Sequence, residues 1–160
     1  MNDNPTPSWT ARMTWHSVPE SARAYFRASP MERIGIVKSR VPARYVAALA
    51  RHMQLPREKL YASLRLGRAT VDRKIRNAEK LTQEESERVL AITRLVGQAE
   101  AIVQESGTPE DFDAATWVGG WLQRPHPALG GYSPAELMDT ADGRAVVTEL
   151  LAQQQSGVYA

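Results

Sequence analysis

The chain has 160 residues, 42% of them hydrophobic, and no cysteine, which allows one sizeable domain or two small ones and excludes disulfides and thiolate metal sites. No apolar run approaches the roughly 20 residues of a membrane span, and the first residues lack the charged start and apolar stretch of a secretory signal, so we expect a cytoplasmic protein without a membrane partner. The net charge of +2 is unevenly divided, because residues 33–80 carry 13 basic and 3 acidic side chains whereas residues 81–160 carry 4 basic and 12 acidic ones.

Residues 1–30 are predicted to form an N-terminal arm rather than a regular element. Prolines at positions 5, 7, 19 and 30 interrupt long helices and strands. Four aromatic residues argue against a purely disordered tail: Trp9, Trp15, Tyr25 and Phe26. We therefore expect an arm that packs loosely or lies on a partner.

From Pro42 onward the pattern is helical. Apolar residues recur at intervals of three and four at Val46, Leu49, Ala50 and Met53, as on one face of a helix. Pro56 suits the start of a second short helix, which has Leu60 and Leu64 on its inner face. After a break at residues 65–68, a third helix has a narrow apolar face made of Val71 and Ile75.

The opposite face of that third helix is polar and basic. Two short helices joined by a tight break are typical of a helix-turn-helix, whose second helix enters the DNA major groove. Arginine and asparagine can each make paired hydrogen bonds to a base, and other basic residues contact phosphates. The predicted DNA-binding residues are Arg65, Arg68, Thr70, Arg73, Lys74, Arg76 and Asn77. The alternative is a solvated basic surface on an ordinary helix pair.

The acidic part of the chain also has a helical pattern. Thr82 and Glu85 have the spacing of a capping box, and the long helix that follows has apolar residues along one side as far as Val103. We expect another helix to start at Thr108-Pro109 and to bury Trp117 and Trp121. Residues 124–132 have the composition of a loop. A third start signal at residues 133–136 precedes the last helix, and Gly157 is its predicted end. Since no alternating strand pattern occurs, the predicted fold class is all-α.

Nothing in the sequence points to an enzyme. His16, His52 and His126 occur in three separate contexts, without the spacing of metal ligands. No nucleophile–base motif or glycine-rich phosphate loop is recognisable. We therefore predict no catalytic residue, no metal and no cofactor.

The order of several motifs resembles the Xre/MbcA/ParS-type antitoxins. These motifs are T-x-x-R-K at 70–74, LTQEESERV at 81–89, W-L at 121–122, ALGG-x-S-P at 128–134 and a G-x-x-V…L…G ending. The resemblance covers roughly residues 37–160. It implies a protein that binds and neutralises a RES-domain toxin, which degrades NAD+, and that forms a homodimer and represses its own operon by binding operator DNA. One departure is that Arg65 stands where the turn usually has glycine.

The resemblance also implies a domain division and a toxin-binding site. The predicted domains are the arm at 1–30, a helix-turn-helix domain with a long connecting helix at 31–103, and a helical toxin-binding domain at 104–160. The predicted toxin-binding residues are Tyr132, Gly157, Val158, Tyr159 and Ala160, with the last four occluding the toxin's NAD+ pocket. One alternative function is a free-standing helix-turn-helix regulator whose C-terminal helices dimerise or bind an effector. Another is an interaction module without a DNA role.

Overall fold

The computed structural model describes residues 13–107 and 110–155. Over these residues the chain forms nine α-helices and no strand, which confirms the predicted all-α fold class. The helices are α1 (Val18–Arg27), α2 (Pro30–Ser39), α3 (Ala43–His52), α4 (Arg57–Ser63), α5 (Arg68–Arg76), α6 (Gln83–Glu105), α7 (Ala114–Gln123), α8 (Pro134–Leu137) and α9 (Ala141–Gln155). A 3-10 turn, Pro127–Leu129, lies between α7 and α8.

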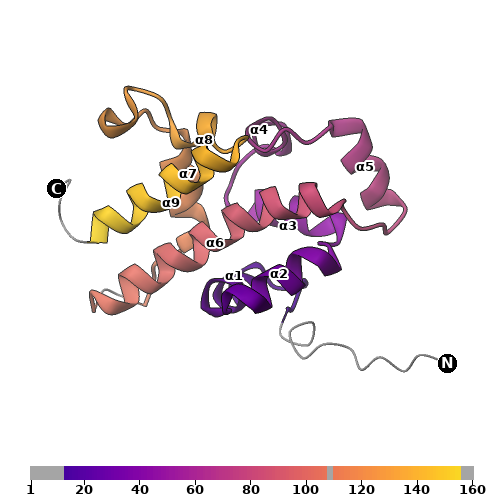
Figure 1. The fold of residues 1–160 in the computed structure, drawn as a ribbon, viewed down its shortest axis with the longest axis horizontal. Coiled ribbons are helices and arrows are strands. Elements are labelled where there is room, and N and C mark those ends of the chain that lie inside the picture. Colours follow the sequence, from indigo (N-terminus) through magenta and orange to yellow (C-terminus); the bar gives the residue numbers. More distant parts are fainter. Residues whose placement is uncertain (1–12, 108–109, 156–160) are drawn as a thin grey trace.

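The long helix α6 connects the two ends of the molecule (Figure 1). Helices α1, α2, α7 and α9 all pack against it. Helix α5 lies at the right-hand end of Figure 1, whereas α7, α8 and α9 lie at the other end. The predicted capping box starts α6, because Thr82 accepts a hydrogen bond from the Glu85 backbone and the Glu85 carboxylate accepts one from the Thr82 backbone.

The predicted N-terminal arm is helical over most of its described residues, which differs from the expectation. Pro19 and Pro30 lie in the first turns of α1 and α2, two positions after the N-cap residue Ser17 and one position after the N-cap residue Ser29. A proline is tolerated there because the first backbone N–H groups of a helix have no intrahelical partner. The two prolines that were expected to interrupt helices therefore begin them. Residues 1–12 lie outside the described part of the chain.

Helix α1 belongs to the core rather than to a loose arm. Its residues Val18 and Ala22 are fully buried, and the helix lies directly against α6. A side chain at Gly97 of α6 would meet the carbonyl group of Ala22 and the side chain of Phe26 at far less than contact distance. The absence of a side chain at Gly97 is thus what allows the two helices to approach each other.

The helix-turn-helix region and the C-terminal helices share one hydrophobic core. Gly119 of α7 lies against the backbone carbonyl of Met53 at the end of α3. Next to this contact, the Thr116 hydroxyl donates a hydrogen bond to the His52 carbonyl at 3.2 Å. The two ends of the molecule are therefore joined by direct backbone contact as well as by α6.

Helix α7 begins later than the sequence predicted. Its N-cap is Asp113, whose carboxylate accepts a hydrogen bond from the Thr116 backbone at 3.0 Å. Phe112 precedes the cap and its ring lies 6.3 Å from that of Trp117, the pairing of a hydrophobic staple. The cap and the staple together set the start of α7 at Ala114, and the predicted start at Thr108-Pro109 lies outside the described residues.

Candidate functional sites

Helices α4 and α5 and the turn between them form the predicted helix-turn-helix. Arg65 lies in the turn with a φ of 52°, a left-handed conformation that glycine adopts most easily. The turn is closed by hydrogen bonds from the Arg65 and Leu66 backbone to the carbonyls of Ala62 and Tyr61 at 3.3 and 2.8 Å. Arg65 therefore occupies the position where a glycine is usual, and Gly67 serves as the N-cap of α5.

Helix α5 is held against the protein by its apolar face. Val71 is fully buried and Ile75 packs partly against the core. The Tyr61 hydroxyl donates a hydrogen bond to the Asp72 carboxylate at 3.0 Å. Burial, followed by this contact with Asp72, raises the pKa of Tyr61 to about 12, in keeping with a protonated hydroxyl that donates to the carboxylate. These contacts fix which side of α5 faces solvent.

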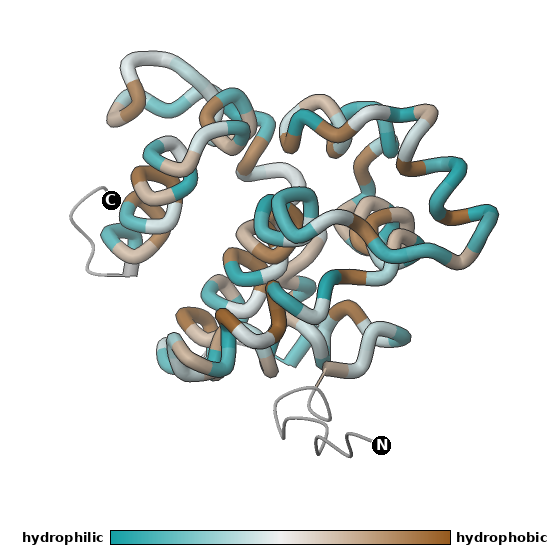
Figure 2. Tube along the Cα trace, turned by 45° about the vertical axis from the view of Figure 1, so that its right-hand side comes forward, coloured by the Kyte–Doolittle hydropathy of each residue, from teal (hydrophilic) through white to brown (hydrophobic). Residues whose placement is uncertain are grey.

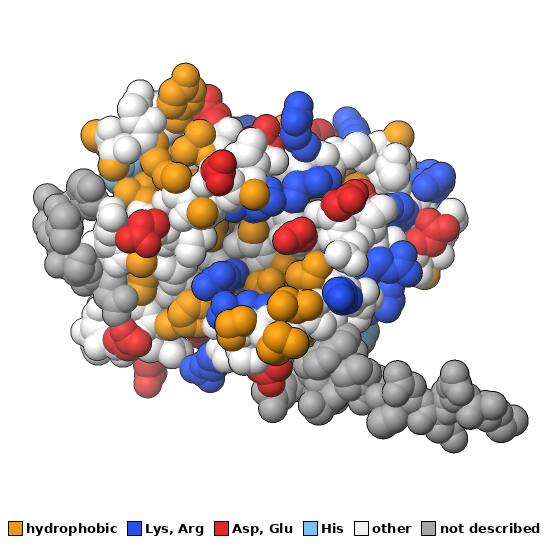
Figure 3. All heavy atoms as spheres, in the orientation of Figure 1, with side chains coloured by type: hydrophobic (Ala, Val, Ile, Leu, Met, Phe, Trp, Pro, Cys, Tyr) orange, Lys and Arg blue, Asp and Glu red, His pale blue; other side chains and the backbone are white. Residues whose placement is uncertain are grey.

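The solvent side of α5 carries most of the predicted DNA-binding residues. Arg73, Arg76 and Asn77 are exposed, as are Arg68 and Thr70 in the first turn. Lys and Arg side chains gather at the right-hand edge of Figure 3, where α5 lies. The same region of the trace is largely hydrophilic in Figure 2.

Lys74 lies apart from this exposed set. Its ammonium group donates a hydrogen bond to the Glu85 carboxylate at 2.7 Å, and both side chains are only 12% exposed. Burial alone would raise the pKa of Glu85, but the hydrogen bonds from Lys74 and Thr82 outweigh it and hold the pKa below its ordinary value of 4.5. The Lys74–Glu85 contact thus holds α5 against the start of α6. We therefore exclude Lys74 from the proposed DNA-binding face.

Replacing Glu85 with glutamine should destabilise the fold by about 2 kcal/mol, because the change leaves Lys74 without its anion at a nearly buried site. The folded pKa of Glu85 lies below 4.5, so the stabilisation is present in full above that pH and is lost as the pH falls through the folded value. Urea unfolding at pH 7 and pH 3 should show a smaller difference from wild type at pH 3. Glu84→Gln, an exposed neighbour, is the matched control and should change stability little.

Two of the predicted DNA-binding arginines also contact other parts of the protein. Arg68 lies 3.3 Å from Glu58 and 3.9 Å from Asp72, and Arg65 lies 3.8 Å from Asp139 between α8 and α9. Both arginine side chains are largely exposed, and exposed ion pairs contribute little energy. A DNA phosphate could therefore replace these carboxylates as the partner of either arginine at little cost in free energy.

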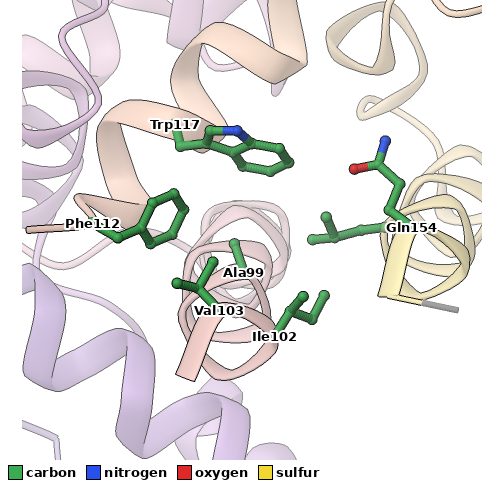
Figure 4. Close-up of a pocket in the computed structure, with 7 residues that line it drawn as sticks. Ala99, Ile102, Val103, Phe112, Trp117 and Gln154 are labelled. Carbon is green, nitrogen blue, oxygen red and sulfur yellow. The ribbon is translucent and has the colours of Figure 1, made fainter. Parts of the chain in front are cut away.

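The C-terminal helices contain an apolar groove that the sequence did not predict. It has a volume of about 210 Å³ and lies between α6, α7 and α9. Its lining residues are Ala99, Ile102, Val103, Phe112, Trp117, Leu151 and Gln154. Figure 4 shows Trp117 and Phe112 on one side of the groove, the α6 residues at its floor, and Gln154 on the facing helix.

The two tryptophans of α7 have different surroundings. Trp121 is buried, as predicted, with 5% of its surface exposed. Trp117 stacks on it with ring centroids 5.9 Å apart, but Trp117 is only half-buried and faces the groove. Phe112, five positions before Trp117, lines the same groove, and the two rings lie 6.3 Å apart.

The predicted toxin-binding residues lie on two segments. Tyr132 is 57% exposed, on a loop closed by a hydrogen bond from the His126 backbone to the Tyr132 carbonyl at 3.0 Å. Gly157, Val158, Tyr159 and Ala160 lie outside the described residues. They follow Gln155 at the end of α9, and the neighbouring Gln154 lines the groove.

The described residues contain no cluster of three or more histidine, cysteine, aspartate or glutamate side chains that could hold a metal ion. None of the helices in that part of the chain is both long enough and apolar enough to cross a membrane.

The fold is that of a two-part protein, a helix-turn-helix followed by a helical domain with an apolar groove. Two family models match it: "Antitoxin Xre-like helix-turn-helix domain" over residues 32–94 and "Antitoxin Xre/MbcA/ParS C-terminal toxin-binding domain" over residues 98–157. A Prs ADP-ribosylating antitoxin from Sphingobium sp. (strain YBL2) is 45% identical over 146 residues, which cover 89% of each chain. The antitoxin Xre of Pseudomonas putida is 27% identical over 88 residues, which cover 55% of this chain and 50% of that protein.

The chain therefore belongs to the Xre/MbcA/ParS family of antitoxins. It is the antitoxin of a toxin–antitoxin system rather than an enzyme. Because its C-terminal domain is a toxin-binding domain, a toxin is its partner. The resemblance seen in the sequence motifs is confirmed.

Proposed function

We propose that this antitoxin binds and neutralises a RES-domain toxin that consumes NAD+, and that as a homodimer it represses its own operon by binding operator DNA. The observation that carries the proposal is the placement of two different surfaces, the basic face of α5 and the apolar groove, at opposite ends of one shared hydrophobic core. Helix α5 has an exposed basic face at one end, and the groove between α6, α7 and α9 lies at the other. The two domains meet between them, where α8 packs against α4 and Asp139 lies 3.8 Å from Arg65. One molecule can therefore hold both partners at once.

The DNA-binding half of the proposal rests on the shape and charge of α5. The face of α5 around Val71 and Ile75 is held against the protein, and the opposite face, with Arg73, Arg76 and Asn77, is exposed and could enter a major groove. Arg73 and Asn77 are suited to base edges, whereas Arg65, Arg68 and Arg76 are suited to phosphates. Helix-turn-helix proteins commonly bind as two-fold dimers whose recognition helices lie about 34 Å apart, one helical turn of DNA, which is why we propose a homodimer.

The toxin half of the proposal rests on the C-terminal domain. The name of the Sphingobium relative refers to ADP-ribosylation of Prs, a reaction for which NAD+ is the usual donor. A RES-domain toxin that degrades NAD+ also binds that molecule, so both point to a toxin with an NAD+ pocket. We propose that residues 157–160 block this pocket, with exposed Tyr132 contacting the toxin nearby.

Removing residues 156–160 should leave the toxin bound but active. The C-terminal domain would keep its folded surface, whereas nothing would fill the NAD+ pocket. The measurement is NAD+ consumption by purified toxin in the presence of an equimolar amount of full-length or shortened antitoxin. Full-length antitoxin should suppress consumption, and the shortened form should restore at least about half of it. If the shortened form suppresses the toxin fully, the tail is not the inhibitory element.

Co-expression with the cognate toxin tests the partnership itself. We expect a stable complex whose mass contains both chains. A helix-turn-helix regulator without a toxin partner would instead purify alone, and binding of a small effector or self-association would then account for its C-terminal helices.

A further inference from the structure

We propose that the apolar groove between α6, α7 and α9 is an anchor site on which the toxin seats an apolar side chain flanked by basic residues. This inference rests on the proposed function, because it assumes that a toxin binds the C-terminal domain. It adds the position of the contact and the chemistry of the toxin segment that makes it.

The groove has the properties of a docking site rather than of a packing defect. Its lining combines buried Ala99 and Leu151 with half-buried Ile102, Phe112 and Trp117. A volume of about 210 Å³ exceeds that of one large aliphatic or aromatic side chain. Half-exposed aromatic walls around a concave apolar floor are typical of the pockets that receive interface hot-spot residues.

The position of the groove indicates the toxin as its occupant. All seven lining residues lie in the segment 98–157 that matches the toxin-binding family model. Gln154 lines the groove, and residues 156–160 begin two positions later. Five residues span at most roughly 17 Å even when fully extended. A toxin pocket that receives residues 157–160 must therefore lie close to the groove, and the surface around that pocket would cover it.

Charge indicates the kind of toxin segment that fits. Residues 98–157 contain 9 acidic and 2 basic side chains. Asp111 and Asp113, both exposed, flank Phe112 at the edge of the groove. A toxin segment with an apolar residue at its centre and lysine or arginine beside it would complement this edge, because charged rims favour partners of opposite charge.

The absence of cysteine from the chain permits a direct test with a single attachment point. A Val103→Cys variant, labelled with a benzophenone maleimide, places a photo-crosslinker in the groove. Val146→Cys is the matched control, because Val146 is 48% exposed on α9 and does not line the groove. Each labelled variant is irradiated in the purified complex with the cognate toxin, and the products are weighed and mapped by peptide mass.

The proposal predicts a toxin adduct from the groove variant at a yield at least about fivefold above that of the control. Three results would overturn it. A cross-link to residues 156–160 would show that the tail fills the groove in the complex, and a cross-link to a second copy would show a dimer contact. Equal toxin yields from both variants would show that the groove is not a preferred contact.

A charge placed in the groove gives a second readout. Val103→Asp should weaken the complex by at least about tenfold, which corresponds to 1.4 kcal/mol, since a carboxylate would have to be desolvated against the toxin's apolar side chain. Val146→Asp should change the affinity by less than threefold. If Val103→Asp and Val146→Asp both fold and bind the toxin equally well, the groove is not the anchor site, whereas the proposed function still holds. If unmodified antitoxin does not bind the toxin, both the proposed function and this inference are overturned.

Discussion

Replacing Gly119 with alanine is expected to lower the free energy of unfolding by about 3 kcal/mol. The added methyl group would lie against the backbone carbonyl and side chain of Met53, well inside contact distance. A flexible side chain could move aside, but a carbonyl at the end of α3 cannot move without displacing that helix. The substitution should therefore separate α7 from α3 and weaken the junction between the two halves of the protein.

The neighbouring glycine provides the control. An added methyl at Gly120 meets nothing within 4 Å, so Gly120→Ala should be neutral or should stabilise α7 by up to about 1 kcal/mol, as alanine usually does in a helix. Urea unfolding of the two variants measures the difference. If both variants unfold at the same urea concentration as wild type, α3 and α7 are not in the contact described here.

The second large effect is expected from Arg73→Ala, which should weaken operator binding by roughly 10–100-fold and leave toxin neutralisation unchanged. Arg73 is exposed in the middle of α5, where a bidentate contact to a base contributes about 1–3 kcal/mol. The groove between α6, α7 and α9 lies at the other end of the molecule, so the toxin contacts proposed there should not change. Fluorescence anisotropy with a labelled operator duplex measures the first effect, and NAD+ consumption by the toxin measures the second.

Arg124→Ala is the matched control for this experiment. It removes the same charge from an exposed position just after α7, and we expect operator binding to stay within about twofold of wild type. Binding by wild-type protein should also fall steeply with salt, because phosphate contacts release counterions. Equal losses for the two variants would indicate that only the total charge matters and that α5 reads no sequence.

Much of this architecture could be predicted from local sequence signals. The capping boxes at Thr82 and Ser133 mark where α6 and α8 begin, and the 3.6-residue period placed Val71 in the core. The break between the two short helices also fell where the structure has its turn. These features depend on residues within a few positions of one another, so a single sequence contains what is needed to recognise them.

The prediction failed where local signals have two meanings. Proline both ends helices and begins them, and only the N-cap hydrogen bonds of Ser17 and Ser29 show that the second role applies to Pro19 and Pro30. Lys74 lies on the polar side of α5, but its ion pair with Glu85 depends on how α6 folds back. The apolar groove could not be predicted because two of its lining residues, Ala99 and Leu151, are far apart in the sequence.

The central claim is that DNA and toxin occupy opposite ends of the same molecule. Native mass spectrometry of antitoxin mixed with operator duplex, and with toxin not exceeding the antitoxin, tests it most directly. The account predicts one ternary species that contains antitoxin, toxin and DNA together. Separate antitoxin–toxin and antitoxin–DNA species, with each partner displacing the other, would contradict it by showing that the two partners compete for one surface.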